Sequence, residues 1–82
     1  MRTYEKLKLF INEKGFKQNA IAHKTGINAK SLNAMLNGYV ELKVDALIDI
    51  CEIGMEIPVE KFFMFKVPES RIKTYGKEVK AT

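Results

Sequence analysis

Apolar residues recur at steps of three and four along most of this chain, the spacing that gathers side chains on one side of a helix. The first segment with this spacing stops before Gly15, and glycine tolerates the left-handed conformation that closes many helices. Thr3 is positioned to cap its start. The pattern therefore predicts a first helix over residues 3–14, one side of which is formed by Tyr4, Leu7, Phe10, Ile11 and Lys14.

Two shorter helices are predicted next, over residues 18–25 and 28–36. Gly26 lies between them. Asn28 is a good N-cap for the second, because its side-chain oxygen can accept hydrogen bonds from the free N–H groups of the first turn. Asn37 and Gly38 then end this helix. The buried side of the pair is predicted to consist of Ile21, Ala22, Leu32, Met35 and Leu36.

The apolar spacing continues through residues 44–54 and 58–65 and predicts a fourth and a fifth helix. Gly54 would end the fourth. Pro58 would occupy the first position of the fifth, where its missing N–H costs nothing. Phe62 and Phe63 are expected to fill the core. Helices joined by such short connections predict a compact all-α domain over residues 1–65. The apolar side of the fourth helix contains Val44, Leu47, Ile48 and Cys51, and its polar side contains Asp45, Asp49 and Glu52.

Charge is distributed unevenly along the chain, whose net charge is +4. Residues 1–40 carry seven basic and two acidic side chains, a net +5, whereas residues 41–65 carry two and six, a net −4. Residues 66–82 are basic again, with five against two, a net +3. This segregation indicates either one face suited to a polyanion or ordinary solvated surfaces.

Composition argues against several classes of protein. With a single cysteine, Cys51, no internal disulfide can form, and with a single histidine, His23, no metal site is expected. No apolar run is long enough for a membrane span. There is no catalytic triad, phosphate-binding loop or nucleotide fingerprint, so we expect no enzyme activity, cofactor or small-molecule ligand. His23 and Cys51 are interpreted as a surface and a core residue.

The two short helices are spaced as in a two-helix unit that presents its second helix to a DNA groove. Such a unit needs a small residue where the helices approach, here Ala22, and a glycine at the turn, here Gly26. The apolar positions that wedge the two helices together are Ile21, Ile27, Leu32 and Met35.

Over residues 4–65 the chain resembles the Xre-type regulators, a family that includes phage Cro proteins and the DNA-binding domains of phage repressors. The resemblance rests on "KQNAIAHKTGINAKSLNAMLNG" and on "VDALIDICEIGMEIPVEKFF", which is similar to that family's fourth and fifth helices. It implies a five-helix, lambda-repressor-like domain that docks its third helix in the major groove of double-stranded DNA, most often as a homodimer on a palindrome. Thr25 stands where the family usually has a larger aliphatic residue, so we expect looser packing at that corner.

The resemblance also implies roles for individual residues. Gln18 matches a glutamine that contacts a phosphate and braces the recognition helix, and Asn37 and Tyr39 follow that helix where the family commonly contacts the DNA backbone. Lys17 and Lys24 either add non-specific attraction or are solvated surface residues. The outward face of the third helix, which we expect to enter the groove, consists of Asn28, Ala29, Lys30, Ser31, Asn33 and Ala34.

Side-chain chemistry suggests how this face would read DNA. Lys30 can donate to guanine O6 and N7, Asn33 can pair with adenine N6 and N7, and the methyl groups of Ala29 and Ala34 can touch thymine. Asn28 serves as a helix cap, a phosphate ligand or both. No acidic residue occurs in 28–36, as expected for a helix that faces phosphates.

Residues 66–82 form a short basic tail that would extend a dimer interface, add contacts to DNA or remain a mobile end. Because no large regulatory domain is visible, we expect a small Cro-like repressor of phage, prophage or bacterial origin that occludes a promoter. It would act in the cytoplasm of a bacterial cell or phage-infected host. The alternative is an antitoxin-like or adaptor module that keeps the fold but binds protein.

Overall fold

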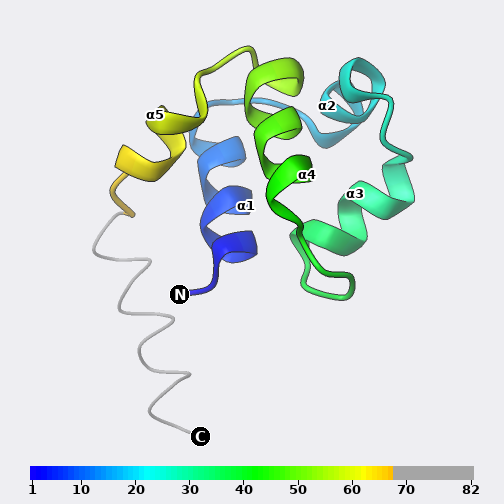
Figure 1. The fold of residues 1–82 in the computed structure, drawn as a ribbon, viewed down its shortest axis with the longest axis horizontal. Coiled ribbons are helices and arrows are strands. Elements are labelled where there is room, and N and C mark those ends of the chain that lie inside the picture. The colour runs from blue at the N-terminus through cyan, green and yellow to red at the C-terminus, as the bar shows by residue number, and fades with distance from the viewer. Residues whose placement is uncertain (68–82) are drawn as a thin grey trace, which may run out of the picture.

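The computed structural model describes residues 1–67, which form five α-helices and one short π-helix and contain no strand (Figure 1). The α-helices are α1 (Thr3–Glu13), α2 (Gln18–Thr25), α3 (Ala29–Leu36), α4 (Val44–Asp49) and α5 (Val59–Met64). The π-helix η1 (Ile50–Gly54) continues directly from α4. The all-α prediction is confirmed. The basic-tail predictions for residues 68–82 lie outside the described residues, and the domain boundary at 65 stays a prediction.

The helix ends follow the predicted signals except at the starts of α1 and α5. Pro58 is the N-cap of α5 and Val59 its first residue, so the prediction that Pro58 occupies the first helical position is wrong by one residue. Thr3 is the first helical residue rather than the cap, so that prediction is wrong. The backbone N–H of Arg2 donates instead to Oε1 of Glu5, at 2.8 Å. Because a carboxylate at the start of a helix also complements the positive end of its dipole, Glu5 stabilises this terminus in two ways.

One core, to which all the helices contribute, holds the domain together. Leu7, Ile21, Leu32 and Ile50 are fully buried, and Cys51 packs among them. Burial, with a smaller contribution from the charge of Glu52, raises the pKa of the Cys51 thiol to about 11. The thiol is therefore neutral at physiological pH and serves as a small apolar core residue, as predicted.

Aromatic packing fixes α5 against α1. The ring of Phe10 meets those of Phe62 and Phe65 edge-on, with centroids 5.7 and 5.2 Å apart. Phe62 is buried, but Phe63 is 61% exposed, so only one of the two predicted core phenylalanines fills the core. Phe62 is the residue that α5 turns toward Phe10, and Phe63, next to it on the helix, points in a different direction and faces outward.

Close approach of α2 and η1 depends on Gly54. A Cβ atom at this position would lie 2.6 Å from Cγ2 of Ile21 and 3.2 Å from Cγ2 of Thr25. The prediction that Gly54 ends a helix is correct, but its conformation is not the left-handed one of Gly15, Gly26 and Gly38. Gly54 is needed because there is no room for a side chain between the two helices.

None of the helices formed by residues 1–67 has the length and apolar character needed to cross a membrane. Within the same residues, no group of three or more His, Cys, Asp or Glu side chains is arranged to hold a metal ion.

Candidate nucleic-acid interface

The turn between α2 and α3 has the conformation that the sequence predicted. Gly26 has φ +77° and its N–H donates to the carbonyl of Ala22, which closes α2. Thr25 is half-buried, and its Oγ1 both donates to the carbonyl of Ile21, at 2.8 Å, and accepts from the N–H of Ile27, at 3.2 Å. A threonine therefore satisfies backbone groups at this corner, which a larger aliphatic residue could not do.

Asn28 caps α3. Its Oδ1 accepts hydrogen bonds from the N–H groups of Lys30, at 2.8 Å, and Ser31, at 3.4 Å. The predicted cap is confirmed, while a phosphate contact by the same residue stays a prediction. Such a contact would use the side-chain NH₂ group of Asn28, because the amide oxygen only accepts hydrogen bonds and an anion requires a donor.

The opposite end of α3 is held by α1, a contact that no sequence signal predicted. Nζ of Lys8 donates to Oδ1 of Asn37 at 2.6 Å. One turn earlier on α1, the ring of Tyr4 packs on Gly38, where an added Cβ would lie 2.5 Å from Cζ of the ring. Because α3 has no basic residue in its own last turn, Lys8 supplies the positive charge that the negative end of the helix dipole favours.

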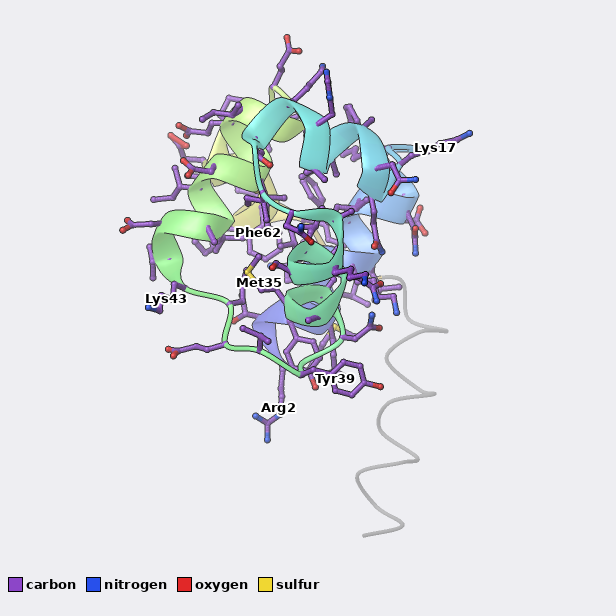
Figure 2. All side chains as sticks on the ribbon, turned by 90° about the vertical axis from the view of Figure 1, so that its right-hand side faces the viewer. Arg2, Lys17, Met35, Tyr39, Lys43 and Phe62 are labelled. Atoms are coloured by element: carbon purple, nitrogen blue, oxygen red, sulfur yellow. The ribbon has the colours of Figure 1, made fainter. Side chains whose placement is uncertain are left out.

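The outward face of α3 is open to solvent. Lys30, Ser31 and Asn33 are exposed, as are Asn28 and Ala29, whereas Ala34 is half-buried. Leu32 and Met35 are buried in the core, and Figure 2 shows Met35 at the left side of the α3 ribbon. The structure thus gathers the predicted groove residues on one face, with Ala34 at its margin.

The flanking candidates lie around this face. Lys17 is exposed just before α2, and Gln18, its first residue, is half-buried. Tyr39 is 83% exposed on the loop after α3, and Asn37 is half-buried beside α1. Figure 2 shows Lys17 and Tyr39 at opposite margins of the face that α3 presents. The structure therefore brings all ten predicted positions to α3 and its borders.

Lys24 is the least suited of the basic candidates. Its Nζ lies 2.6 Å from Oε2 of Glu56, and this hydrogen bond and charge hold the pKa of the Glu56 carboxyl below its usual range. A lysine that is already paired offers less attraction to a phosphate. Its partner follows η1 in a left-handed conformation, with φ +56°.

The electrostatic character of this face comes from an uninterrupted stretch of sequence. No acidic residue occurs between Glu13 and Glu41, a stretch that contains all of α2 and α3. The acidic residues that follow belong mainly to α4, η1 and the loops beside them. A polyanion approaching α3 therefore meets exposed lysines and neutral polar groups, without carboxylates from α2 or α3 themselves.

Comparison with known protein families supplies an independent result. The sequence profile of the Cro/C1-type HTH DNA-binding domain matches residues 6–53, which include α2, α3 and the turn between them. No curated protein and no solved structure matches the chain. The matched family is a DNA-binding one and is typically non-enzymatic. Because the match covers more than half of the sequence, the chain belongs to the Cro/C1-type helix-turn-helix family of DNA-binding domains.

Proposed function

We propose that this protein is a sequence-specific transcriptional regulator that places α3 in the major groove of double-stranded DNA. The observation that carries the proposal is the exposed, acid-free outward face of α3. Such a face can approach phosphates without repulsion and can present short polar side chains to base edges.

The start of α2 supports a phosphate contact beside that groove. The first turn of α2 has no side-chain cap and no acidic residue, whereas α3 is capped by Asn28. Free N–H groups at the positive end of a helix dipole attract anions. Lys17 and Gln18 flank these groups, so a DNA phosphate at this position would receive both backbone and side-chain donors.

Base reading would then depend on a few side chains of α3. Lys30 would donate to guanine O6 and N7, and the methyl group of Ala29 would contact thymine. Ser31 would donate to a phosphate, or donate to or accept from a base edge, and Ala34 would contribute through the exposed part of its methyl group. With two alanines on the face, part of the specificity would come from DNA shape.

We further propose that the protein acts as a homodimeric repressor that occludes a promoter, as expected for a Cro-like regulator of phage, prophage or bacterial origin. Phe63 and Met64, 61% and 72% exposed on α5, supply apolar surface for a second copy. Sedimentation tests this part, because Phe63→Glu should shift the protein from dimer to monomer. A sedimentation profile unchanged by this substitution would remove α5 from the interface.

The experiment that tests the proposal is selection of the purified protein on a random duplex library at physiological salt. Purely electrostatic binding is already weak there, with dissociation constants of about 1–100 µM. An enriched palindrome with half-sites ~10 bp apart is the expected result. If no sequence is enriched, the regulator proposal fails and the protein-binding alternative takes its place.

Two lysine variants localise the interaction. Lys30→Ala should weaken binding to the enriched duplex by about 1–3 kcal/mol, because a base contact in the groove is lost. Lys61→Ala removes the same charge from α5, at the other end of the domain from α3 (Figure 1), and should leave affinity nearly unchanged. Equal losses in the two variants would show that only net charge matters.

A further inference from the structure

Asn33, on the outward face of α3, is connected to α1 by a continuous set of hydrogen bonds. Nζ of Lys8 donates to Oδ1 of Asn37, at 2.6 Å. Nδ2 of Asn37 in turn donates to Oδ1 of Asn33, at 3.0 Å, and to the backbone carbonyl of Asn33, at 2.8 Å. We refer to Lys8, Asn37 and Asn33 as the lysine–asparagine network.

The chemistry of the lysine fixes the direction of every bond in this network. A lysine ammonium has donors and no acceptor, so Asn37 must turn its oxygen toward Lys8. The NH₂ group of Asn37 then faces Asn33, where both neighbouring atoms are oxygens that accept. With Oδ1 of Asn33 turned toward Asn37, the NH₂ group of Asn33 is directed away from that contact.

Reversing this arrangement is unfavourable. Turning the Asn37 amide over would place its NH₂ group against the Lys8 ammonium and its oxygen against two oxygens of Asn33, which loses all three hydrogen bonds at once. Lys8 is half-buried on α1, and its bond to Asn37 is charge-assisted and therefore stronger than a neutral one.

The NH₂ group of Asn33 is free to bind DNA. Asn33 is exposed, and no hydrogen bond from its Nδ2 occurs within residues 1–67. An asparagine that pairs with adenine uses its oxygen to accept from N6 and its NH₂ group to donate to N7. Here the oxygen already accepts one hydrogen bond, from Asn37, which also fixes the direction in which the amide points, whereas both hydrogens of the Asn33 NH₂ group are unused in the described part of the chain. Donation to a base edge is therefore favoured over acceptance from one.

We propose that Lys8 and Asn37 are positioning residues that make Asn33 a hydrogen-bond donor toward base edges, selecting guanine rather than adenine. This inference rests on the proposed function. Guanine presents two acceptors in the major groove, O6 and N7, to the two hydrogens of the amide. Adenine presents one acceptor beside a donor, and cytosine presents only a donor.

The test in DNA compares the base preferences of variants on the random duplex library. The wild-type protein should enrich a position at which guanine exceeds adenine by about tenfold, the lower part of the range for a specific base contact. Asn33→Ala should abolish this preference. Lys8→Met should reduce it several-fold, because Asn37 and Asn33 are then free to turn over and adenine becomes acceptable.

Two controls separate positioning from charge and folding. Lys8→Arg keeps a donor-only cation and should retain the preference, whereas Lys61→Met removes one charge from α5 and should not alter it. Circular dichroism would confirm that Lys8→Met folds, which is expected because methionine preserves much of the lysine's apolar stem. A preference that is identical in wild type and Lys8→Met would overturn the inference while leaving the proposed function intact.

A second measurement needs no DNA. In ¹⁵N-labelled wild-type protein, the side-chain NH₂ protons of Asn37 should exchange more slowly with solvent than those of the exposed residues Asn12 and Asn19, and Lys8→Met should remove the difference. Equal exchange in the wild-type protein would show that the network does not form. A network that forms in a protein that enriches no sequence would overturn the base-reading role together with the proposed function.

Discussion

The two ends of α3 are held in different ways. At its first turn, Asn28 bonds to N–H groups two and three residues further along, and Gly26 provides the preceding turn. At its last turn, Lys8 reaches Asn37 across a sequence separation of 29 residues, and Tyr4 packs on Gly38. The first end is thus built from neighbours in the sequence and the second from another helix.

This difference has a functional consequence. Contacts within the turn fix where α3 begins, whereas contacts with α1 fix how its far end lies relative to the core. Because Lys8 lies on α1, this helix is connected through Asn37 to Asn33, an exposed residue of α3. Changes on α1 should therefore alter DNA reading without touching DNA.

The largest expected effect on stability is at Gly54, where η1 packs against α2, the helix that precedes the first end of α3. Gly54→Val should lower the free energy of unfolding by about 3 kcal/mol, because its side chain would overlap Ile21 and Thr25. Urea denaturation measures this loss. An unchanged midpoint would show that α2 and η1 can separate without cost.

Gly26 should behave differently, because it has open space around it and a left-handed φ of +77°. Gly26→Ala should cost about 1–2 kcal/mol through backbone strain alone. Gly26→Asn should cost less, since asparagine tolerates this conformation better. If both variants lose the same stability in thermal denaturation, strain is not the cause.

Double variants show whether the two ends of α3 are anchored independently. Asn28→Ala should cost about 1 kcal/mol, and Asn37→Ala about 0.5–1.5 kcal/mol. Because the ends share no partner, the losses should add in the double variant, whereas Lys8→Met and Asn37→Ala should together cost less than their sum. The free energies of unfolding are measured by urea denaturation. A loss in the Asn28→Ala/Asn37→Ala double variant that differs from the sum of the single losses would show that the two ends of α3 are not anchored independently.

The smallest effect concerns the exposed Lys24–Glu56 pair. Because Lys24 lowers the pKa of Glu56 in the folded protein, its contribution is present above the ordinary glutamate pKa and is lost as pH falls through the folded value. Glu56→Gln should therefore slightly lower the melting temperature at neutral pH and leave it unchanged in acid. If the melting temperatures of Glu56→Gln and the wild-type protein differ more in acid than at neutral pH, the Lys24–Glu56 pair is not the source of the effect.

The sequence predicted features that depend on neighbouring residues better than features that depend on contacts between distant segments. The five helical segments, the cap at Asn28 and the turn at Gly26 involve residues within a few positions of one another, and these predictions are confirmed. Thr3 and Pro58 each lie one position from their predicted place, and the predicted fourth helix continues from residue 50 as a π-helix. The reason for Gly54 was missed because its neighbour Ile21 lies on another helix. Periodicity also placed Val44 on the apolar side, yet it is 69% exposed at the first position of α4.

The candidate site shows the same limit. The outward residues of α3 could be chosen because a helix buries one side, and the spacing of Leu32 and Met35 identified that side. No local pattern could reveal that Lys8 binds Asn37 or that Lys24 is paired with Glu56, since both contacts arise only when distant segments pack together.

DNA is expected to bind across α3 and the start of α2. Titration of ¹⁵N-labelled protein with the enriched duplex, followed by NMR, tests it most directly. The largest backbone shifts should fall on residues 17–18 and 28–39, with small shifts on α5. Shifts centred on α5, with α3 unaffected, would contradict it.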